Sequence, residues 1–236
     1  MPETEEALTR TAYNVVADVY ADHFRTTEGE QPIDLAMIDH FVALLHEPRV
    51  VLDAGCGAGR MLPYLAGLGC HPEGIDLSPN MVRRARADHP DFTVAVGSLT
   101  HLPYADEVFD GVFSWYSTIH NPDEDLEVMV AEMARVLRPE GVLLLGFQVG
   151  DGMRRVGRGY AARGYDVVMT RYHRSVESLT ALLEEHGLTV SAQLERSPVG
   201  SEEDAQAVII AQDLSPSEWC GSNERFRGVW EPAPLP

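Results

Sequence analysis

The 236 residues of the chain are 44% hydrophobic and 23% charged, the composition of an ordinary globular protein, and suffice for one substantial core. The formal net charge of −19 at pH 7 argues against nucleic acid as a partner, because a protein that binds phosphates needs a basic surface. The apolar runs are too short to span a bilayer, the N-terminus lacks the features of a signal peptide, and the three cysteines show no CxxC spacing, so we expect a cytoplasmic protein with no membrane segment and no metal site.

The first fifty residues predict two helices ahead of any strand. Apolar side chains recur at spacings of three and four over residues 13–24, and again over residues 33–45. A polar break separates the two runs, so we expect two helices rather than one.

Short apolar runs then alternate with amphipathic segments. The expected strands are VVLDAG, HPEGIDL, FTVAV, VFDGVFSW and GVLLLGFQV, and the expected helices are MLPYLAGLG, the segment after Ser78 and residues 122–137. This order predicts an α/β fold with a Rossmann-like, doubly wound parallel sheet and helices on both faces. Ligands of such sheets bind beyond the carboxyl ends of the strands.

The pattern changes after Val149. Residues 150–174 form a Gly- and Arg-rich insertion with one strand-like run, DVVMTRYH, and a helix is expected over residues 175–186. Two further strand candidates, LTVSAQLE and AVIIAQ, are separated by a loop that suits a hairpin, so the sheet should have seven strands and an antiparallel C-terminal hairpin. We expect one domain over residues 1–212, followed by a C-terminal extension, residues 213–236, whose anchors would be Trp219, Phe226 and Trp230.

The loop after the first strand carries a pattern typical of ligand binding. In VVLDAGCGAGR, Gly55, Gly57 and Gly59 allow a tight turn against a helix N-terminus, which favours a polar or anionic ligand. The dinucleotide fingerprint requires a further glycine where Arg60 stands, and it does not explain Asp53. Asp76 ends the next strand, where its carboxylate can accept both ribose hydroxyls of an adenosine.

With these features, the sequence resembles the class I S-adenosylmethionine-dependent methyltransferases over roughly residues 13–212. The matching stretches are DAGCGAG, GIDLSPNMV, VGSLTHLPYADEVFDGVFS and ARVLRPEGVLLLG. The resemblance implies S-adenosyl-L-methionine as cofactor and S-adenosyl-L-homocysteine as product. It implies cofactor contacts from the glycine loop to the aminocarboxypropyl end (Asp53, Gly55, Cys56, Gly57, Gly59), from Asp76 to the ribose, from Leu77 and Met81 to the adenine face, and from Gly97, Ser98 and Leu99 to the adenine edge. The family often has Asp where this chain has Ser98, so the bond to the adenine amine would be weaker or made by the backbone.

The N-terminal segment YNVVADVYADHF resembles the helix that closes over the cofactor in small-molecule members of the superfamily. We therefore interpret residues 1–47 as a helical lid and the insertion at 150–174 as a second part of it. Tyr13 and Tyr20 are candidates for contacts to the carboxylate end of the cofactor. Alternatively, they form an aromatic face that packs on the sheet.

The stretch SWYSTIHNP follows the fourth strand, where the resemblance places the reacting methyl group. His120 is the best candidate for a general base, with substrate hydrogen bonding and structural capping of the Asn121-Pro122 turn as alternatives. Tyr116 is a second candidate catalytic residue, and Trp115 a candidate cofactor contact, unless both are core residues. The arginines of the insertion could meet an acidic substrate or simply be solvated, and Arg83, Arg84 and Arg86 are expected to face solvent without a function.

These features favour methyl transfer to an oxygen or nitrogen atom of a small-molecule acceptor by a monomer or homodimer. An RNA or protein methyltransferase is an alternative that would need a docking surface. A methyltransferase-fold protein that binds the cofactor without transferring methyl is a further alternative.

Overall fold

The computed structural model of the chain describes residues 4–214. The helices of this part are α1 (Glu5–His23), α2 (Pro32–Leu44), α3 (Leu62–Gly67), α4 (Pro79–Asp88), α5 (Asp123–Val136), α6 (Arg158–Ala161) and α7 (Val176–Glu185). The strands are β1 (Val50–Ala54), β2 (His71–Asp76), β3 (Val94–Val96), β4 (Phe109–Trp115), β5 (Leu137–Gln148), β6 (Met153–Val156), β7 (Met169–Tyr172), β8 (Leu188–Arg196) and β9 (Gln206–Asp213). Every helix and strand that the sequence predicts before residue 150 is present.

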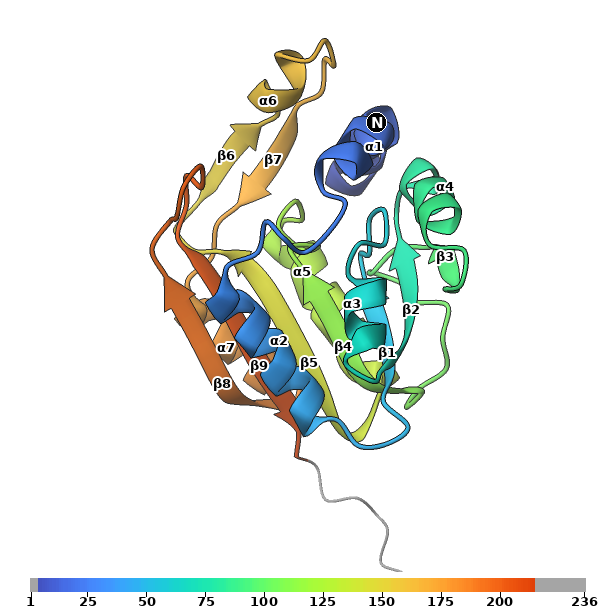
Figure 1. Cartoon of the computed structure of the whole chain (residues 1–236). Helices are drawn as coiled ribbons and strands as arrows, with labels where there is room; N and C mark the ends of the chain where they lie inside the picture. Colours follow the sequence, from blue (N-terminus) through green and yellow to red (C-terminus); the bar gives the residue numbers. More distant parts are fainter. Residues whose placement is uncertain (1–3, 215–236) are drawn as a thin grey trace, which may run out of the picture.

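Seven of these strands form one sheet, in the order β3-β2-β1-β4-β5-β9-β8 (Figure 1). Strands β1 to β5 pair parallel with one another, and β9 pairs antiparallel with both β5 and β8. The predicted Rossmann-like sheet, mostly parallel with an antiparallel C-terminal hairpin, is therefore confirmed. The strand order reverses between β1 and β4, so the crevice that binds ligands in such sheets lies at the carboxyl ends of these two strands.

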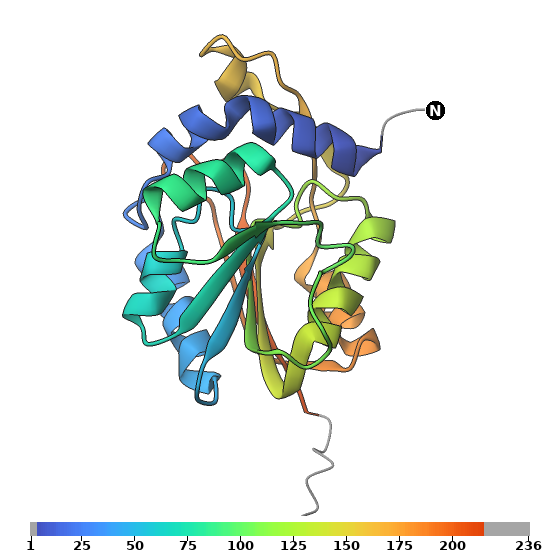
Figure 2. The ribbon, with the colours of Figure 1, turned by 90° about the vertical axis from the view of Figure 1, so that its right-hand side faces the viewer.

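Alternating side chains of the central strands fill a core on each face of the sheet. Val51 and Phe113 pack into the core beneath α2, whereas their neighbours Leu52 and Val112 pack into the core beneath α5. Figure 2 shows α2, α3 and α4 on one face and α5 and α7 on the other. Because both faces are covered, the strands appear in the sequence as nearly continuous apolar runs.

Helix α1 lies across the carboxyl ends of the strands, above α4 (Figure 2). The Asn14 side chain accepts a hydrogen bond from the Ser78 hydroxyl at 2.7 Å, and Asp18 forms ion pairs with Arg83 at 2.6 Å and Arg84 at 3.2 Å. The expectation that Arg83, Arg84 and Arg86 face solvent holds for Arg83 and Arg86, which are exposed, but was wrong for Arg84, whose side chain is only 16% exposed. Arg83 and Arg84 connect α4 to α1, because α1 brings acidic side chains to the face of α4 that the sequence assigns to solvent.

The insertion after β5 forms a separate two-stranded antiparallel sheet of β6 and β7, with α6 between them (Figure 1). Only the second of these strands was predicted. Strand β6 has no apolar alternation, and its Met153 side chain is 73% exposed, so the sequence carries no burial signal for it. The hairpin contacts α1, since Val167 and Met169 pack against Ala12 and Val16 of that helix.

Three further expectations from the sequence concern the C-terminal tail, a membrane span and a metal site. The proposed tail anchors Trp219, Phe226 and Trp230 lie outside residues 4–214. Within this range, no helix combines the length and apolar character needed to cross a bilayer. The same residues contain no group of three or more His, Cys, Asp or Glu side chains placed to hold a metal ion.

Candidate functional site

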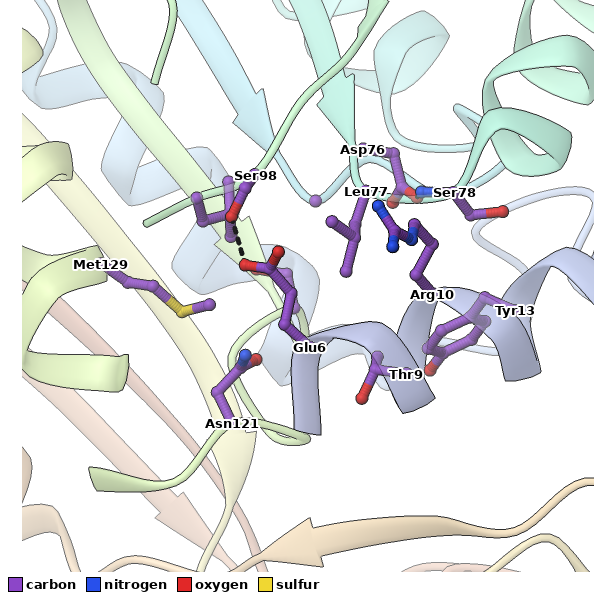
Figure 3. Close-up of a pocket in the computed structure, with 13 residues that line it drawn as sticks. Glu6, Thr9, Arg10, Tyr13, Asp76, Leu77, Ser78, Ser98, Asn121 and Met129 are labelled. Atoms are coloured by element: carbon purple, nitrogen blue, oxygen red, sulfur yellow. Dashed lines mark hydrogen bonds between the residues drawn. The ribbon is translucent and has the colours of Figure 1, made fainter. Parts of the chain in front are cut away.

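A cavity opens at the point where the strand order reverses, between the carboxyl ends of the strands and helix α1 (Figure 3). The space not filled by protein atoms is about 460 Å³, including the part open to solvent. Its floor consists of Gly55, Asp76, Leu77, Ser78, Ser98, Leu99, Ser117, Asn121 and Met129. Its roof is one face of α1, formed by Glu6, Thr9, Arg10 and Tyr13.

The spacing of the roof residues explains how one helix covers the whole cavity. Glu6, Thr9, Arg10 and Tyr13 follow each other at intervals of three, one and three residues, which places all four side chains on one face of an α-helix. The Thr4 side chain caps this helix by accepting a hydrogen bond from the Ala7 N–H. Glu6 accepts a hydrogen bond from the Ser98 hydroxyl at 2.5 Å and so connects the roof to the floor.

The glycine loop brings its backbone to the cavity. The N–H groups of Gly55 and Cys56 both donate to the Ile75 carbonyl, at 2.8 and 2.9 Å, which ties the loop to β2. Gly55 has a φ of +83°, and a Cβ at this position would lie 2.2 Å from Cβ of Ser117. Only glycine therefore allows the loops after β1 and β4 to approach this closely.

Asp76 is held at the end of β2 by two backbone hydrogen bonds. One carboxylate oxygen accepts from the Gly57 N–H and the other from the Ser78 N–H, each at 2.8 Å. Burial raises the pKa of Asp76 to about 6, although the two hydrogen bonds oppose this increase. Each oxygen retains acceptor capacity towards the cavity, as a pair of ribose hydroxyls requires.

Asp53 is a buried carboxyl group with an unsatisfied atom. The residue is 1% exposed, and its Oδ2 has no hydrogen-bond partner. Burial raises its pKa to about 8, against the opposing charge of Arg60. Arg60 itself forms an ion pair with Glu30 at 2.5 Å, and Oδ2 of Asp53 stays without a hydrogen-bond partner among residues 4–214.

His120 lies behind the cavity wall and both of its ring nitrogens have partners. Nδ1 lies 2.6 Å from the Thr170 carbonyl oxygen and Nε2 lies 3.1 Å from the Tyr13 hydroxyl. Because a carbonyl can only accept, Nδ1 carries the proton, and Nε2 accepts from Tyr13. Burial lowers the pKa of His120 to about 4, with the Thr170 carbonyl opposing the decrease and the charge of Arg171 adding to it. In this arrangement neither ring nitrogen has a free lone pair that could take a proton from a bound substrate.

The structure divides the remaining predicted site residues between the cavity and its supports. Tyr20 lies over the glycine loop, its ring 3.7 Å from the Cβ position of Gly57, whereas Met81 is buried among Ala17, Ala21 and Ala58. Trp115 stacks on Phe113 in the core. The predicted residues that line the cavity are Tyr13, Gly55, Asp76, Leu77, Ser98 and Leu99. Those that do not line it are Tyr20, Asp53, Cys56, Gly57, Gly59, Met81, Gly97, Trp115, Tyr116 and His120.

Sequence reasoning missed several lining residues. Ser117 and Asn121 flank His120 in the stretch SWYSTIHNP, but a catalytic role is predicted there for His120 and Tyr116 and not for these two. Glu6, Thr9 and Arg10 precede the aromatic run from which the first helix was predicted. Extending that helix by two turns and following the face that carries Tyr13 would have led to Glu6, seven residues earlier.

The cavity fits an aminoacyl-type nucleoside in several independent respects. The glycine backbone permits close approach, and Asp76 suits two vicinal hydroxyls. Asp53 does not line the cavity, but its unsatisfied oxygen, two residues before Gly55, suits a hydrogen-bond donor such as an ammonium group. The apolar side chains Leu77 and Leu99 suit a flat base next to them.

Comparison with known proteins finds similarity to methyltransferases. Residues 51–141 match the family described as "Methyltransferase domain". The chain is 36% identical over 148 residues to Methyltransferase GfsG of Streptomyces halstedii, which covers 58% of this chain and 52% of that protein. It is 27% identical over 164 residues to a malonyl-[acyl-carrier protein] O-methyltransferase of Enterobacter lignolyticus, with 69% and 62% covered. The chain thus spans about half the length of the curated relatives it matches.

Solved structures of methyltransferases share the fold. A SAM-dependent methyltransferase of Methanosarcina mazei superimposes with a TM-score of 0.66 at 21% identity, covering 78% of this chain and 98% of that one. The magnesium protoporphyrin IX methyltransferase of Synechocystis, solved with bound SAM, gives a TM-score of 0.65 at 17% identity, covering 89% and 98%. At these identities, the likeness establishes the fold.

Proposed function

We propose that this chain, which belongs to the class I S-adenosylmethionine-dependent methyltransferase superfamily, transfers a methyl group from S-adenosyl-L-methionine to an oxygen or nitrogen atom of a small-molecule acceptor. The cofactor is that of the superfamily, as the sequence predicts. The observation that carries the proposal is the roofed cavity between Asp76 and Tyr13. Asp53, which has an unsatisfied buried oxygen, does not line the cavity but lies two residues before Gly55, which does.

In this proposal, each end of the cavity receives one part of the cofactor. Asp53 would accept from the ammonium group, and the Gly55 backbone would lie against the aminocarboxypropyl chain. Asp76 would accept from the ribose hydroxyls, and Leu77 and Leu99 would contact the adenine. When bound, the cofactor supplies an electrophilic methyl group on a sulfonium. The protein has to align an acceptor with that methyl group and exclude water.

Helix α1 would exclude water from the cavity. It closes the cavity from above through four lining side chains and is held on α4 by Asn14 and Asp18. The lid hairpin supports α1 from the other side through Val167 and Met169. Entry and release of the cofactor would then require these contacts to open.

The bonds of His120 restrict the acceptor chemistry. With both ring nitrogens engaged, His120 would position Tyr13 and β7 rather than accept a proton. We therefore propose an acceptor whose nucleophilic atom has a free lone pair without help from His120, such as a neutral amine or an ionised phenol or carboxylate. The same observation gives some support to a second candidate function, a cofactor-binding protein that does not transfer methyl.

Small-molecule acceptors are also consistent with the relatives. Their names include a sterol methyltransferase-like protein of Botryococcus braunii and the malonyl-[acyl-carrier protein] enzyme, neither of which acts on RNA by name. The net charge of −19 disfavours a nucleic-acid substrate. An RNA methyltransferase would instead bind oligonucleotide with a steep salt dependence.

The test has two stages. Calorimetry should show that S-adenosyl-L-methionine and S-adenosyl-L-homocysteine bind the purified chain, and Asp76→Ala should abolish the binding. Formation of S-adenosyl-L-homocysteine is then measured with panels of amines, phenols and carboxylic acids. Failure of the unmodified chain to bind either cofactor form would overturn the proposal. Tight binding without turnover on any panel would favour the second candidate.

A further inference from the structure

The carboxylate of Glu6 closes the end of the cavity beside Ser98 (Figure 3). The Ser98 hydroxyl donates to Oε2 of Glu6 at 2.5 Å, and the Thr100 hydroxyl lies within hydrogen-bond distance of the same oxygen, at 3.2 Å. Glu6 comes from the first turn of α1, whereas Ser98 and Thr100 come from the loop after β3. The contact therefore joins residues 92 positions apart in the chain.

The hydrogen-bond directions leave one carboxylate oxygen available. The Ser98 hydroxyl accepts from the Thr100 N–H at 3.1 Å and also lies 2.8 Å from the Thr100 hydroxyl, a pair in which either oxygen could donate. With its single proton on Glu6 at 2.5 Å, Ser98 is the acceptor in that pair and has no proton left for a ligand. Both hydroxyl contacts are to Oε2, and Oε1 of Glu6 accepts no hydrogen bond from residues 4–214. Glu6 has no cationic partner in that range, and its charge adds to the effect of burial in raising the pKa of nearby Asp125.

A carboxylate placed this way calls for a hydrogen-bond donor on the ligand. We propose that Glu6 accepts a hydrogen bond from the exocyclic amine of the adenine, so that the lid helix, and not the loop after β3, recognises the base. This inference rests on the proposed function, because Asp76 and Leu77 define where the nucleoside lies. It explains how an uncharged residue is accommodated at Ser98: the negative charge comes from α1, and Ser98 orients it.

The arrangement links recognition of the base to closure of the lid. Glu6 reaches the cavity only when α1 lies on α4 through Asn14 and Asp18. A nucleoside that offers an amine then adds a bond between floor and roof, whereas one that presents a carbonyl oxygen at that position places two acceptors face to face. Helix α1 would therefore close more firmly over adenine than over hypoxanthine.

The experiment compares two ligands across matched variants. Dissociation constants are measured by calorimetry for S-adenosyl-L-homocysteine and for S-inosyl-L-homocysteine, in which a carbonyl oxygen replaces the amine. The unmodified chain should prefer the adenosyl ligand by about 10- to 100-fold, the range expected for a hydrogen bond to a charged acceptor. Glu6→Ala should reduce this preference to about threefold or less, mainly by weakening the adenosyl ligand. Glu5→Ala, which removes the same charge from the same turn outside the cavity, should preserve the preference.

A rescue variant separates recognition from lid stability. Adding Ser98→Asp to Glu6→Ala returns a carboxylate to the same end of the cavity from the loop side, and it should restore most of the preference. If Glu6 only held the helix down, Glu6→Ala would weaken both ligands equally and leave their ratio unchanged, which would overturn the inference. Tighter binding of the adenosyl ligand to Glu6→Ala would also overturn it, because Glu6 would then be blocking the cavity.

If the unmodified chain binds neither ligand, the proposed function itself fails. Tight binding of both without discrimination removes only the role of Glu6.

Discussion

The Tyr13 hydroxyl donates a hydrogen bond to Nε2 of His120 at 3.1 Å, across 107 positions of the chain. The opposite side of the same ring donates to the Thr170 carbonyl at 2.6 Å. One buried imidazole thus joins α1 and the loop after β4, which both contribute lining residues to the cavity, to β7, which does not line it. We refer to these two hydrogen bonds as the His120 bridge.

The His120 bridge predicts a measurable energetic coupling between Tyr13 and His120. Tyr13→Phe leaves Nε2 of His120 buried without a donor, and His120→Asn keeps an amide donor for Thr170 but removes Nε2. Each variant should lower the free energy of unfolding by about 1–3 kcal/mol. The double variant should cost about 1 kcal/mol less than the sum, measured by urea unfolding. Strictly additive losses would show that the two residues do not stabilise each other.

The lowered pKa of His120 predicts a specific dependence of stability on pH. Burial holds this pKa at about 4 in the folded chain, against 6.5 for an unperturbed histidine. As the pH falls from about 6.5 to 4, the unfolded chain gains a proton on His120 and the folded chain does not, so stability is lost over this window. Urea unfolding at pH 7.5 and 5 should show a greater loss for the unmodified chain than for His120→Asn. Equal losses would mean that His120 titrates normally.

His120 should not affect the pH dependence of kcat near neutral pH. If methyl transfer is measured between pH 5.5 and 8, kcat should show no inflection that His120→Asn removes, because the ring is neutral throughout this range. An inflection near pH 6.5 that disappears in His120→Asn would restore the general-base interpretation.

Asp53 predicts the opposite trend with pH. Burial holds its pKa at about 8, against 3.8 for an unperturbed carboxyl. Between these values the unfolded chain has released the proton and the folded chain keeps it, so stability falls as the pH rises. Asp53→Asn should be more stable than the unmodified chain by an amount that grows from pH 4 to 8 and then levels off.

The control for Asp53 is cofactor affinity. If Asp53 accepts from the ammonium group, Asp53→Asn should weaken S-adenosyl-L-homocysteine at least tenfold while it stabilises the apoprotein. A stability advantage that shrinks with rising pH, measured by urea unfolding, would contradict the raised pKa.

Gly55 and Gly67 form a matched pair for testing the glycine loop. Gly55→Ala places a Cβ 2.2 Å from that of Ser117 at a φ of +83° and should cost about 2–4 kcal/mol in unfolding free energy. Gly67 ends helix α3 with open space around its Cβ position, so Gly67→Ala should stabilise by about 0.5–1 kcal/mol. Only Gly55→Ala should weaken cofactor binding, as calorimetry can determine. A loss of affinity in both variants would indicate a general effect on the domain.

The parts of the fold that were predicted correctly depend on local signals. Strands buried on both faces give continuous apolar runs, Ser78 caps α4 through the Met81 N–H, and the glycine loop needs positive φ at Gly55. Strand β6 was missed because its partner β7 pairs with it in a small exposed sheet that buries little apolar surface.

The functional residues were predicted less completely because their roles depend on distant partners. Arg84 has the same appearance in sequence whether it faces water or binds Asp18 and Asp22 of α1. His120 was placed correctly after β4, but only the fold shows that Tyr13 and Thr170 occupy both nitrogens.

The sequence by itself therefore determined the order of elements, the glycine loop and the position of Asp76, because short-range periodicity and turn chemistry specify them. The tertiary structure decided what covers the cavity, which histidine nitrogen is protonated and which carboxylate faces Ser98. These depend on the docking of α1 across the sheet, where side chains up to 107 positions apart satisfy one another's hydrogen bonds. No local pattern encodes such a pairing, since each partner is only one of many polar residues until the fold brings the two together.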